Sequence, residues 1–541
     1  MPEPSFPLST RNHFVPSPEE FGELSSLGMH KEEEITRLDN AISHFQTELA
    51  QLRARKAVGR RPVVVAHSLA QLEATRTALA RQVRTYQTIL APIRRLPPEL
   101  LECIFSFVHS AALSETLASA LKASIRISQT CALWRSIAFG LPILWSAIHL
   151  RFNNVPGTSR TRAQSFSLIL GRCTHRPLSI SIHAMSRFET VYLPPQMPET
   201  LLRIKHRWRT LDLAISSNYF EMLLTAFEDQ LPELRHLKLN LWWTNFQRRA
   251  VNNDSLDIAK LLRATPGLAS LELRNIPLVY TADRPSFRPE QHPLESLVLD
   301  LVYSQEVSWL DTVRRTPRLK RMELLNIPFT YEVPSDGPIL LSDLASLEIT
   351  TEHIAETVLL GLTAPRLAHL AIGSPIPYEN RQLFTGEVFS SFMSRSSCNL
   401  RSLSLRNLRL FGRDLASTLV HLAPLEELEI VSLSPYQSVI DPELTNLWDM
   451  TLPNLRHLRL TVEMNDDPRW VHTLRGTLLS RTPGFRPPFA DGKAFERVDL
   501  AFCGGERPDA ELRDIFDLWE AGDVSYSFSY TLDNQEPQPS P

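Results

Sequence analysis

The chain has 541 residues, and its shares of apolar residues (43%) and charged residues (22%) are typical of a chain that mostly folds. Because a single hydrophobic core stops growing well below this length, several domains or a repeat array are expected. A net charge of -3 and five scattered cysteines without a CxxC pair argue against a nucleic-acid or membrane surface, a disulfide framework and a zinc site.

The N-terminal segment, residues 1–30, is rich in Pro, Ser and Glu, which predicts a disordered lead-in. It lacks the basic and then apolar order of a signal peptide. No stretch of the chain approaches the roughly 20 apolar residues that cross a bilayer. We therefore expect a soluble protein of the cytosol or the nucleus.

Residues 31–92 predict a helical, coiled-coil-like hairpin. Apolar residues recur at spacings of three and four in two seams that a breaker at residues 59–62 separates. The seams are Ile35, Leu38, Ile42, Phe45, Leu49 and Leu52, and then Leu69, Leu72, Leu79, Val83, Tyr86 and Leu90. A hairpin folded on itself is the favoured interpretation, with self-association as the alternative. The basic stretch 51–95 is either an anion-binding face or a solvated surface, and it lacks the interleaved aromatic residues of a stacking platform.

Residues 93–145 predict three short helices. Pro98 suits the first position of a helix, and Glu99 complements the helix N-terminus. The apolar stripe that follows is too broad for a half-buried helix, so two neighbours must share it. Later helices are marked by two apolar sets: Leu113, Leu117 and Leu121, and then Ile127, Cys131, Trp134 and Ile137. So small a unit is marginal alone, which implies an external partner.

These residues resemble the F-box family. The opening motif is Leu96, Pro97, Glu99 and Leu100, and the closing motifs are Cys131-x-x-Trp134-Arg135 and Leu144-Trp145, although Thr130 replaces a usual Val and the linker between the halves is long. The resemblance, especially to fungal F-box proteins, implies contact with the small adaptor subunit of an SCF-type cullin-RING ubiquitin ligase, and through it with a cullin. The implied adaptor-binding residues are Leu96, Pro97, Leu100, Leu101, Ile104, Phe105, Val108 and Trp134, the last also a part of the core. A helical linker with a chance Leu-Pro-Pro-Glu-Leu start is the alternative.

Residues 146–532 predict an α/β solenoid of irregular leucine-rich repeats with a parallel sheet on its concave face. An apolar triplet with the spacing of Leu234, Leu237 and Leu239 recurs up to Phe495, Val498 and Leu500, mostly at leucine-rich-repeat intervals. Weaker copies begin at Trp145, Leu178 and Trp208. Helices are expected at 255–263, 307–314, 354–361 and 414–421. A helix at 510–519 and a strand at 524–532 would close the array before a disordered tail, residues 533–541.

The predicted concave face suggests where a protein substrate binds. Glu272, Glu323, Glu348 and Glu429 recur at one register, and Glu323 would face Glu348 across adjacent strands. Either Arg321 or a basic segment of a partner relieves this like-charge pair. Trp242, with Trp243, is either an exposed anchor or a filler of the core. The proposed substrate-binding set is therefore Glu272, Arg321, Glu323, Glu348, Glu429 and Trp242.

No sequence motif for catalysis or phosphate binding is found, and we expect no catalytic residue, metal ligand or cofactor. The leading hypothesis is the substrate-recognition subunit of a ubiquitin ligase, with an unknown protein substrate. A non-catalytic scaffold that acts outside a ligase is the main alternative. An enzyme with its site in the insertion 275–292 is the third.

Overall fold

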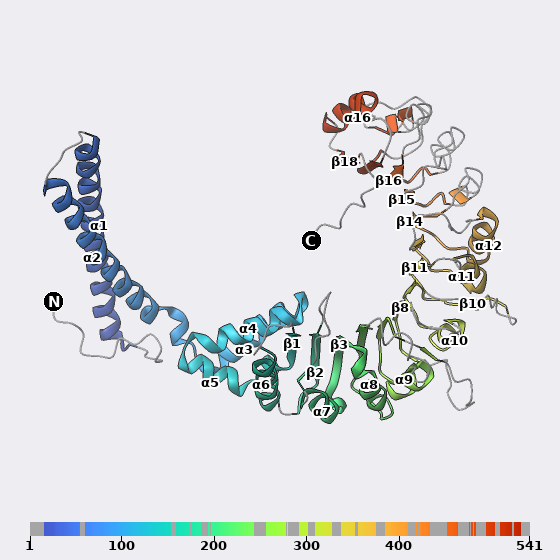
Figure 1. Cartoon of the computed structure of the whole chain (residues 1–541), viewed down its shortest axis with the longest axis horizontal. Helices are drawn as coiled ribbons and strands as arrows, with labels where there is room; N and C mark the ends of the chain where they lie inside the picture. The colour runs from blue at the N-terminus through green and yellow to red at the C-terminus, as the bar shows by residue number, and fades with distance from the viewer. Residues whose placement is uncertain are drawn as a thin grey trace. The chain divides into compact units, whose positions relative to one another are not determined.

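The fold is seen in a computed structural model of the chain (Figure 1), which describes residues 16–54, 60–152, 158–173, 175–184, 193–194, 196–242, 256–276, 278–279, 292–300, 309–326, 337–351, 355–374, 385–408, 418–419, 422–432, 452–463, 475–476, 478–479, 481–482, 494–503, 509–521 and 524–531. The chain divides into two compact units. One comprises residues 1–149 and 164–178 and is mainly helical, and the other comprises residues 150–163 and 179–541 and is built on a parallel sheet.

Two long helices open the described chain, α1 (Pro18–Ala54) and α2 (Arg60–Leu90). Leu24, early in α1, packs in a buried cluster with Ile89, late in α2. Farther along α1, Asp39 accepts hydrogen bonds from Arg76, which lies earlier in α2. Residues later in α1 thus contact residues earlier in α2, so the two helices are antiparallel, as the two seams predict.

Helix α1 begins at Pro18, so residues 18–30 are helical and the predicted disordered lead-in is wrong for them. The cause is a capping box. The backbone N–H of Ser17 donates to Glu20 Oε2 (2.7 Å), and the backbone N–H of Glu20 donates to Ser17 Oγ (3.3 Å). Leu24 is then completely buried against α2, which stabilises the first turns. Residues 1–15 lie outside the described residues.

Five short helices follow: η1 (Pro92–Arg95), α3 (Pro98–Glu115), α4 (Leu117–Thr130), α5 (Ala132–Gly140) and η2 (Pro142–Trp145). Two predicted groupings differ from these boundaries. Leu113, assigned to the second helix, lies in α3, and Ile127, assigned to the third, lies in α4. The breaks fall where a side chain caps a new helix: Thr116 Oγ1 accepts from the Ser119 N–H (3.0 Å), and Cys131 Sγ accepts from the Trp134 N–H (3.5 Å).

A sheet of fourteen strands follows, and its strands lie side by side in chain order. They are β1 (Ala147–Phe152), β2 (Leu178–Ala184), β3 (Trp208–Ser216), β4 (His236–Trp242), β6 (Ser270–Arg274), β8 (Ser296–Asp300), β9 (Arg321–Leu325), β11 (Ser346–Thr350), β13 (His369–Gly373), β14 (Ser402–Arg406), β15 (Glu427–Ser432), β16 (His457–Glu463), β17 (Arg497–Cys503) and β18 (Ser525–Thr531). From β3 onwards each strand pairs in parallel with the next. Two short ladders lie outside this sheet, β5 (Leu256–Asp257) with β7 (Leu278–Val279) and β10 (Ile339–Leu340) with β12 (Leu362–Thr363).

Helices connect many of these strands. They are α6 (Thr158–Arg172), α7 (Gln196–Arg203), η3 (Lys205–Arg207), η4 (Ser217–Tyr219), α8 (Phe220–Ala226), α9 (Ile258–Ala264), α10 (Trp309–Arg314), α11 (Ala355–Gly361) and α12 (Gly386–Ser396). Helices α8 to α12 lie on one side of the sheet (Figure 1). The predictions for 255–263, 307–314 and 354–361 correspond to α9, α10 and α11, whereas the prediction for 414–421 falls mostly outside the described residues.

The core lies between the sheet and these helices. Every apolar residue of the predicted triplets from Leu234 to Leu500 is buried, and none is more than 3% exposed. Side chains alternate across a strand, so the residues between the triplet positions point to the opposite face. That face carries the polar and charged side chains and is called the open face below.

Asparagine ends three of the strands with the backbone in the left-handed region. Asn275, Asn326 and Asn407 have φ angles of 54°, 48° and 54°. Each backbone N–H donates to a carbonyl oxygen of the next strand, at 2.8, 2.7 and 2.6 Å. Asn326 Nδ2 also donates to Asp300 Oδ1 (3.0 Å) on the preceding strand. Asparagine tolerates this backbone conformation better than most residues, which explains why it recurs here.

Replacing Asn326 tests this strand-ending arrangement. We expect Asn326→Ala to lower the free energy of unfolding by about 1–3 kcal/mol, because it loses the bond to Asp300 and strains the backbone. Asn326→Gly loses the same bond but adopts the positive φ freely, so it should be less destabilising. Denaturant titration of the two variants gives the comparison. Equal losses would show that backbone conformation contributes nothing at this position.

The C-terminal end of the sheet is covered by α16 (Asp509–Ala521), which packs on β18. Phe516 stacks on Tyr526 with ring centroids 5.2 Å apart, and the fully buried Trp519 donates from Nε1 to Thr482 Oγ1 (3.0 Å). This agrees with the predicted closing helix and strand. The predicted tail, residues 533–541, lies outside the described residues.

Candidate functional site

One side of α3 belongs to the core of the helical unit. Leu101 and Phe105 are 0% and 1% exposed. The ring of Phe105 lies 4.9 Å from that of Trp134 in α5, centroid to centroid, and Trp134 is half-buried. These contacts tie α3 to α5 and fix the direction in which the remaining side chains of α3 point.

The other side of α3 is apolar and open to solvent. Leu100, Ile104, Phe107 and Val108 are 50%, 38%, 75% and 40% exposed. Their spacing of four, three and one places them on one face of the helix. We call these four residues the α3 apolar face. A contiguous apolar face on a soluble domain is typical of a protein-interaction site.

The local sequence explains why α3 begins where it does. Pro97 has an extended backbone (φ -62°, ψ 152°), and Pro98 occupies the first helical position, where no N–H is needed. Glu99 lies in the positively polarised first turn. Leu96, half-buried, and Pro97, exposed, therefore lie immediately before the α3 apolar face.

The predicted adaptor-binding residues fall into an accessible group and a buried group in the structure. Leu96, Pro97, Leu100, Ile104 and Val108 are at least partly accessible. Leu101 and Phe105 are buried within the unit, so in this structure their side chains belong to the core and are not open to a partner. Trp134 is a half-buried core residue that supports Phe105. Phe107, which the prediction did not include, is the most exposed of the group, and its position three residues after Ile104 places it on the same helix face.

A buried histidine joins α3 to α4. His109 is 1% exposed, and its Nδ1 lies 3.0 Å from Ser124 Oγ. Burial lowers the pKa of His109, so the neutral imidazole is favoured at neutral pH. His109 thus helps to hold α3 in place without placing a charge in the core.

The region that contains the five short helices matches a known family. Residues 93–151 match the F-box-like family. The chain therefore contains an F-box-like domain. Its F-box-like domain points to binding of the small adaptor subunit of SCF ubiquitin ligases, and through the adaptor to a cullin. A search of curated proteins found no match to the chain.

Two further observations concern membranes and metals. Within the described part of the chain, no helix is both long and apolar enough to cross a membrane. The described residues also contain no group of three or more His, Cys, Asp and Glu side chains that could hold a metal ion.

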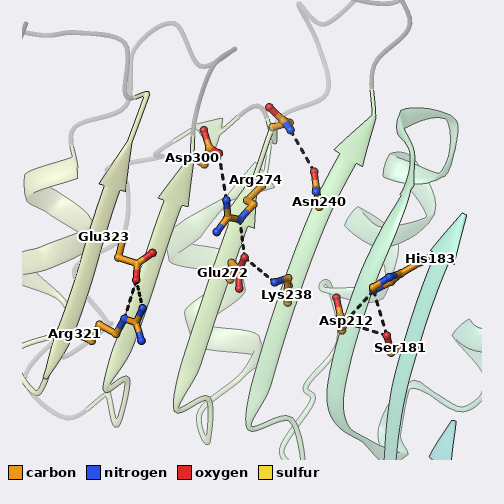
Figure 2. A network of polar contacts seen from close by, with 11 residues as sticks. Ser181, His183, Asp212, Lys238, Asn240, Glu272, Arg274, Asp300, Arg321 and Glu323 are labelled. Carbon is orange, nitrogen blue, oxygen red and sulfur yellow. Dashed lines mark hydrogen bonds and ion pairs between the residues drawn. The ribbon is translucent and has the colours of Figure 1, made fainter. Parts of the chain in front are cut away.

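The open face of the sheet carries a cluster that contains serine, histidine and aspartate (Figure 2). Ser181 Oγ and His183 Nε2 each lie 3.0 Å from Asp212 Oδ2, and they lie 3.2 Å from each other. A catalytic triad uses two different ring nitrogens, one for serine and one for aspartate. Here one nitrogen faces both groups, so the cluster departs from the triad arrangement and forms a polar contact between β2 and β3. Burial alone would raise the pKa of Asp212, but the hydrogen bonds from His183 and Ser181 outweigh it and lower that pKa.

The predicted glutamates of the open face have cationic neighbours (Figure 2). Glu272 Oε1 lies 2.9 Å from Lys238 Nζ and 2.6 Å from Arg274 Nε. Arg274 also approaches Asp300 at 3.7 Å. The carboxylates on β6 and β8 are therefore compensated from within the sheet.

Glu323 and Glu348 are direct neighbours in the register of β9 and β11, as predicted. Arg321 Nε donates to Glu323 Oε1 (2.7 Å), so the internal relief of the like-charge pair is present. The Glu323 side chain is only 11% exposed, whereas that of Glu348 is 34% exposed. Glu348 therefore has more of its side chain open to a binding partner than Glu323 has.

Glu429 has the most extensive set of contacts. It accepts from Ser404 Oγ (2.6 Å) and from Arg406 Nη2 (2.7 Å), and Arg459 lies 3.2 Å away. Burial alone would raise the pKa of Glu429, but these hydrogen bonds and charges outweigh it and lower that pKa. The open face is therefore one of mixed charge, because cations of the chain pair with Glu272, Glu323 and Glu429, the glutamates predicted to meet a basic partner.

Trp242 lies at the end of β4 and is 42% exposed, which favours the interpretation as an accessible residue over core filling. An exposed tryptophan is a common anchor at protein interfaces. Trp243 lies outside the described residues.

Proposed function

We propose that this F-box protein is the substrate-recognition subunit of an SCF-type ubiquitin ligase. In this proposal the α3 apolar face, with Leu96 and Pro97, binds the adaptor. Residues 146–532 form an irregular leucine-rich-repeat solenoid whose open face binds a protein substrate. The α1–α2 pair acts as a coiled-coil-like hairpin before the F-box-like domain.

The single observation that carries the proposal is the four-residue apolar face within the matched F-box-like region. Burying a large apolar side chain yields about 1.5–3 kcal/mol, so burial of these four residues would offset part of the entropic cost of binding. Leu101 and Phe105 fix this face from behind.

The repeat interpretation rests on three features. The strands pair in parallel and in chain order, the apolar triplets are buried, and helices cover one face of the sheet. These features are typical of strand–helix repeats. Side chains from many strands then combine into one surface, which suits recognition of an extended protein segment. Within the predicted substrate-binding set, Trp242 is 42% exposed, and the Glu348 side chain is 34% exposed and accepts no hydrogen bond from a described residue, so both are open to a substrate.

In the proposed ligase, catalysis belongs to other subunits, and this chain contributes proximity and orientation. A non-catalytic scaffold outside a ligase is the second candidate, because the open face would bind proteins equally well without an adaptor. The two candidates differ in what happens to a bound protein.

Reconstitution distinguishes the two functions. The full chain, purified with adaptor, cullin and RING subunits, is loaded with proteins that it captures, and ubiquitin transfer is followed. We expect modification of at least one captured protein, and loss of that modification when Leu100 and Ile104 are both replaced with glutamate. Captured proteins that stay unmodified in both reactions would favour the scaffold.

A further inference from the structure

The open face is hollowed over β11, β13 and β14. The hollow has a volume of about 390 Å³ and extends to charged side chains of β15, β16 and β17. Its floor contains the small side chains of Ala371, Ser402 and Ser404, where long side chains occupy equivalent places on neighbouring strands. We call it the β11–β14 hollow. Its volume greatly exceeds the roughly 30 Å³ share of one water molecule, so it has room for a side chain.

The charged side chains of β15 to β17, together with Arg406 of β14, are already satisfied. Arg406 donates to Glu429 Oε2 from Nε (3.0 Å) and from Nη2 (2.7 Å). Asp499 accepts from Arg497 Nε (2.9 Å) and from Ser527 Oγ (2.6 Å). These charges are engaged with one another and leave little capacity for a further ligand.

Three other side chains that line the hollow, on β11 and β14, are not satisfied. Within the described residues Glu348 accepts no hydrogen bond, and its nearest cation is Arg406 Nη1 at 3.9 Å. The hydroxyls of Ser346 and Ser402, which also line the hollow, make no hydrogen bond to any described residue. A carboxylate and two hydroxyls that face a hollow can all accept hydrogen bonds.

The charge of the hollow favours a cation. Three arginines and four carboxylates line it, which leaves a net charge of -1 with histidine neutral: Arg406, Arg459 and Arg497 against Glu348, Glu427, Glu429 and Asp499. Because Arg406 is held by Glu429, its charge is largely compensated beside Glu348. A single positive charge placed at Glu348 would neutralise the hollow.

We propose that the β11–β14 hollow binds a lysine or arginine side chain of an extended segment of the recognised protein, with Glu348 as its charge partner. This inference rests on the proposed function, because it assigns the chemistry of the bound protein. The floor over Ala371 admits the aliphatic part of the side chain, and Glu348, Ser346 and Ser402 accept from its charged end. Among the four predicted glutamates, Glu348 has both free acceptor capacity and adjacent space.

Peptide pools test the inference on the full chain bound to its adaptor. Four pools of nonapeptides carry a central Lys, Arg, Gln or Glu between randomised flanks, and retention on the immobilised complex is measured. We expect the Lys and Arg pools to bind about tenfold better than the Gln and Glu pools. Glu348→Gln should abolish this preference.

Two matched controls accompany this variant. Glu323→Gln makes the same chemical change one strand away, at a carboxylate that already accepts a hydrogen bond from Arg321. This variant should keep the preference for the Lys and Arg pools. Ala371→Leu should reduce binding of the cationic pools by filling the hollow, whereas Val298→Leu, at the same register on β8, should not. Thermal unfolding of each variant shows that it is folded.

Equal retention of all four pools, or no retention above that of an unrelated protein, would overturn the inference. A preference that survives in Glu348→Gln would also overturn it. These results would leave the proposed function standing if the same complex still modified a captured protein. Failure of the wild-type chain to bind the adaptor would contradict the proposed function whatever the pools show.

Discussion

Replacing both Leu100 and Ile104 with glutamate is expected to weaken adaptor binding by at least about 100-fold. Each large apolar side chain contributes about 1.5–3 kcal/mol when a partner buries it, and 1.4 kcal/mol corresponds to a tenfold change in affinity. The added carboxylates would also have to lose water in the interface. Isothermal titration of the purified adaptor into the full chain measures the effect.

The control for this variant is Leu168→Glu on α6. Leu168 is 64% exposed, so its replacement changes charge and apolar area without touching α3. We expect its adaptor affinity to equal that of the wild type. Undiminished binding by the double glutamate variant, with unchanged helical content, would rule out the α3 apolar face as the adaptor site.

Two phenylalanines of α3, Phe105 and Phe107, should respond in opposite ways to alanine. Phe105→Ala removes a ring that is 1% exposed and packs on Trp134, so we expect a loss of about 3–5 kcal/mol in the stability of the helical unit. Phe107→Ala removes a ring that is 75% exposed, so stability should hardly change while adaptor affinity falls.

Hydrogen exchange on the full chain separates these effects, because it reports the helical unit and the sheet individually. Phe105→Ala should increase exchange throughout α3, α4 and α5 and leave β6 to β16 unchanged. Equal protection of α3 in both alanine variants would mean that Phe105 does not hold the unit together, contrary to its burial.

The repeat pattern and the start of α3 were predictable from the sequence. An apolar triplet after a turn specifies a buried strand, because alternate side chains must share one face. Pro98 followed by Glu99 specifies a helix start in the same local way. Such features depend on neighbours in the chain and need no knowledge of the tertiary structure.

The two faces of α3 were not separable from the sequence. Leu100, Leu101, Ile104, Phe105 and Val108 together spread over a wide part of the helix surface. Which of them is covered depends on where Trp134 and α4 pack, which periodicity does not specify. Leu101 and Phe105 were therefore assigned to a partner although they form the core.

The charge pairs of the open face needed the register of the sheet. Sequence alignment of the strands predicted that Glu323 and Glu348 are neighbours, and the register has them paired. The alignment did not predict two ion pairs. Arg274 lies two residues after Glu272 on β6 and reaches it, and Arg406 lies two residues after Ser404 on β14 and reaches Glu429 on β15. Long flexible side chains select their partners only once the strands are in place, so the acidic pattern overstated the charge of the surface.

The most direct test of the account is hydrogen exchange on the full chain with and without the purified adaptor. We predict a stable complex in which amides around the α3 apolar face, and those of Leu96 and the first turn of α3, become protected. The strands from β6 to β16 should exchange at the same rate in both samples, since the open face remains available for a substrate. Absence of a complex, or protection confined to the sheet with α3 unchanged, would contradict the assignment of this chain as an adaptor-bound subunit.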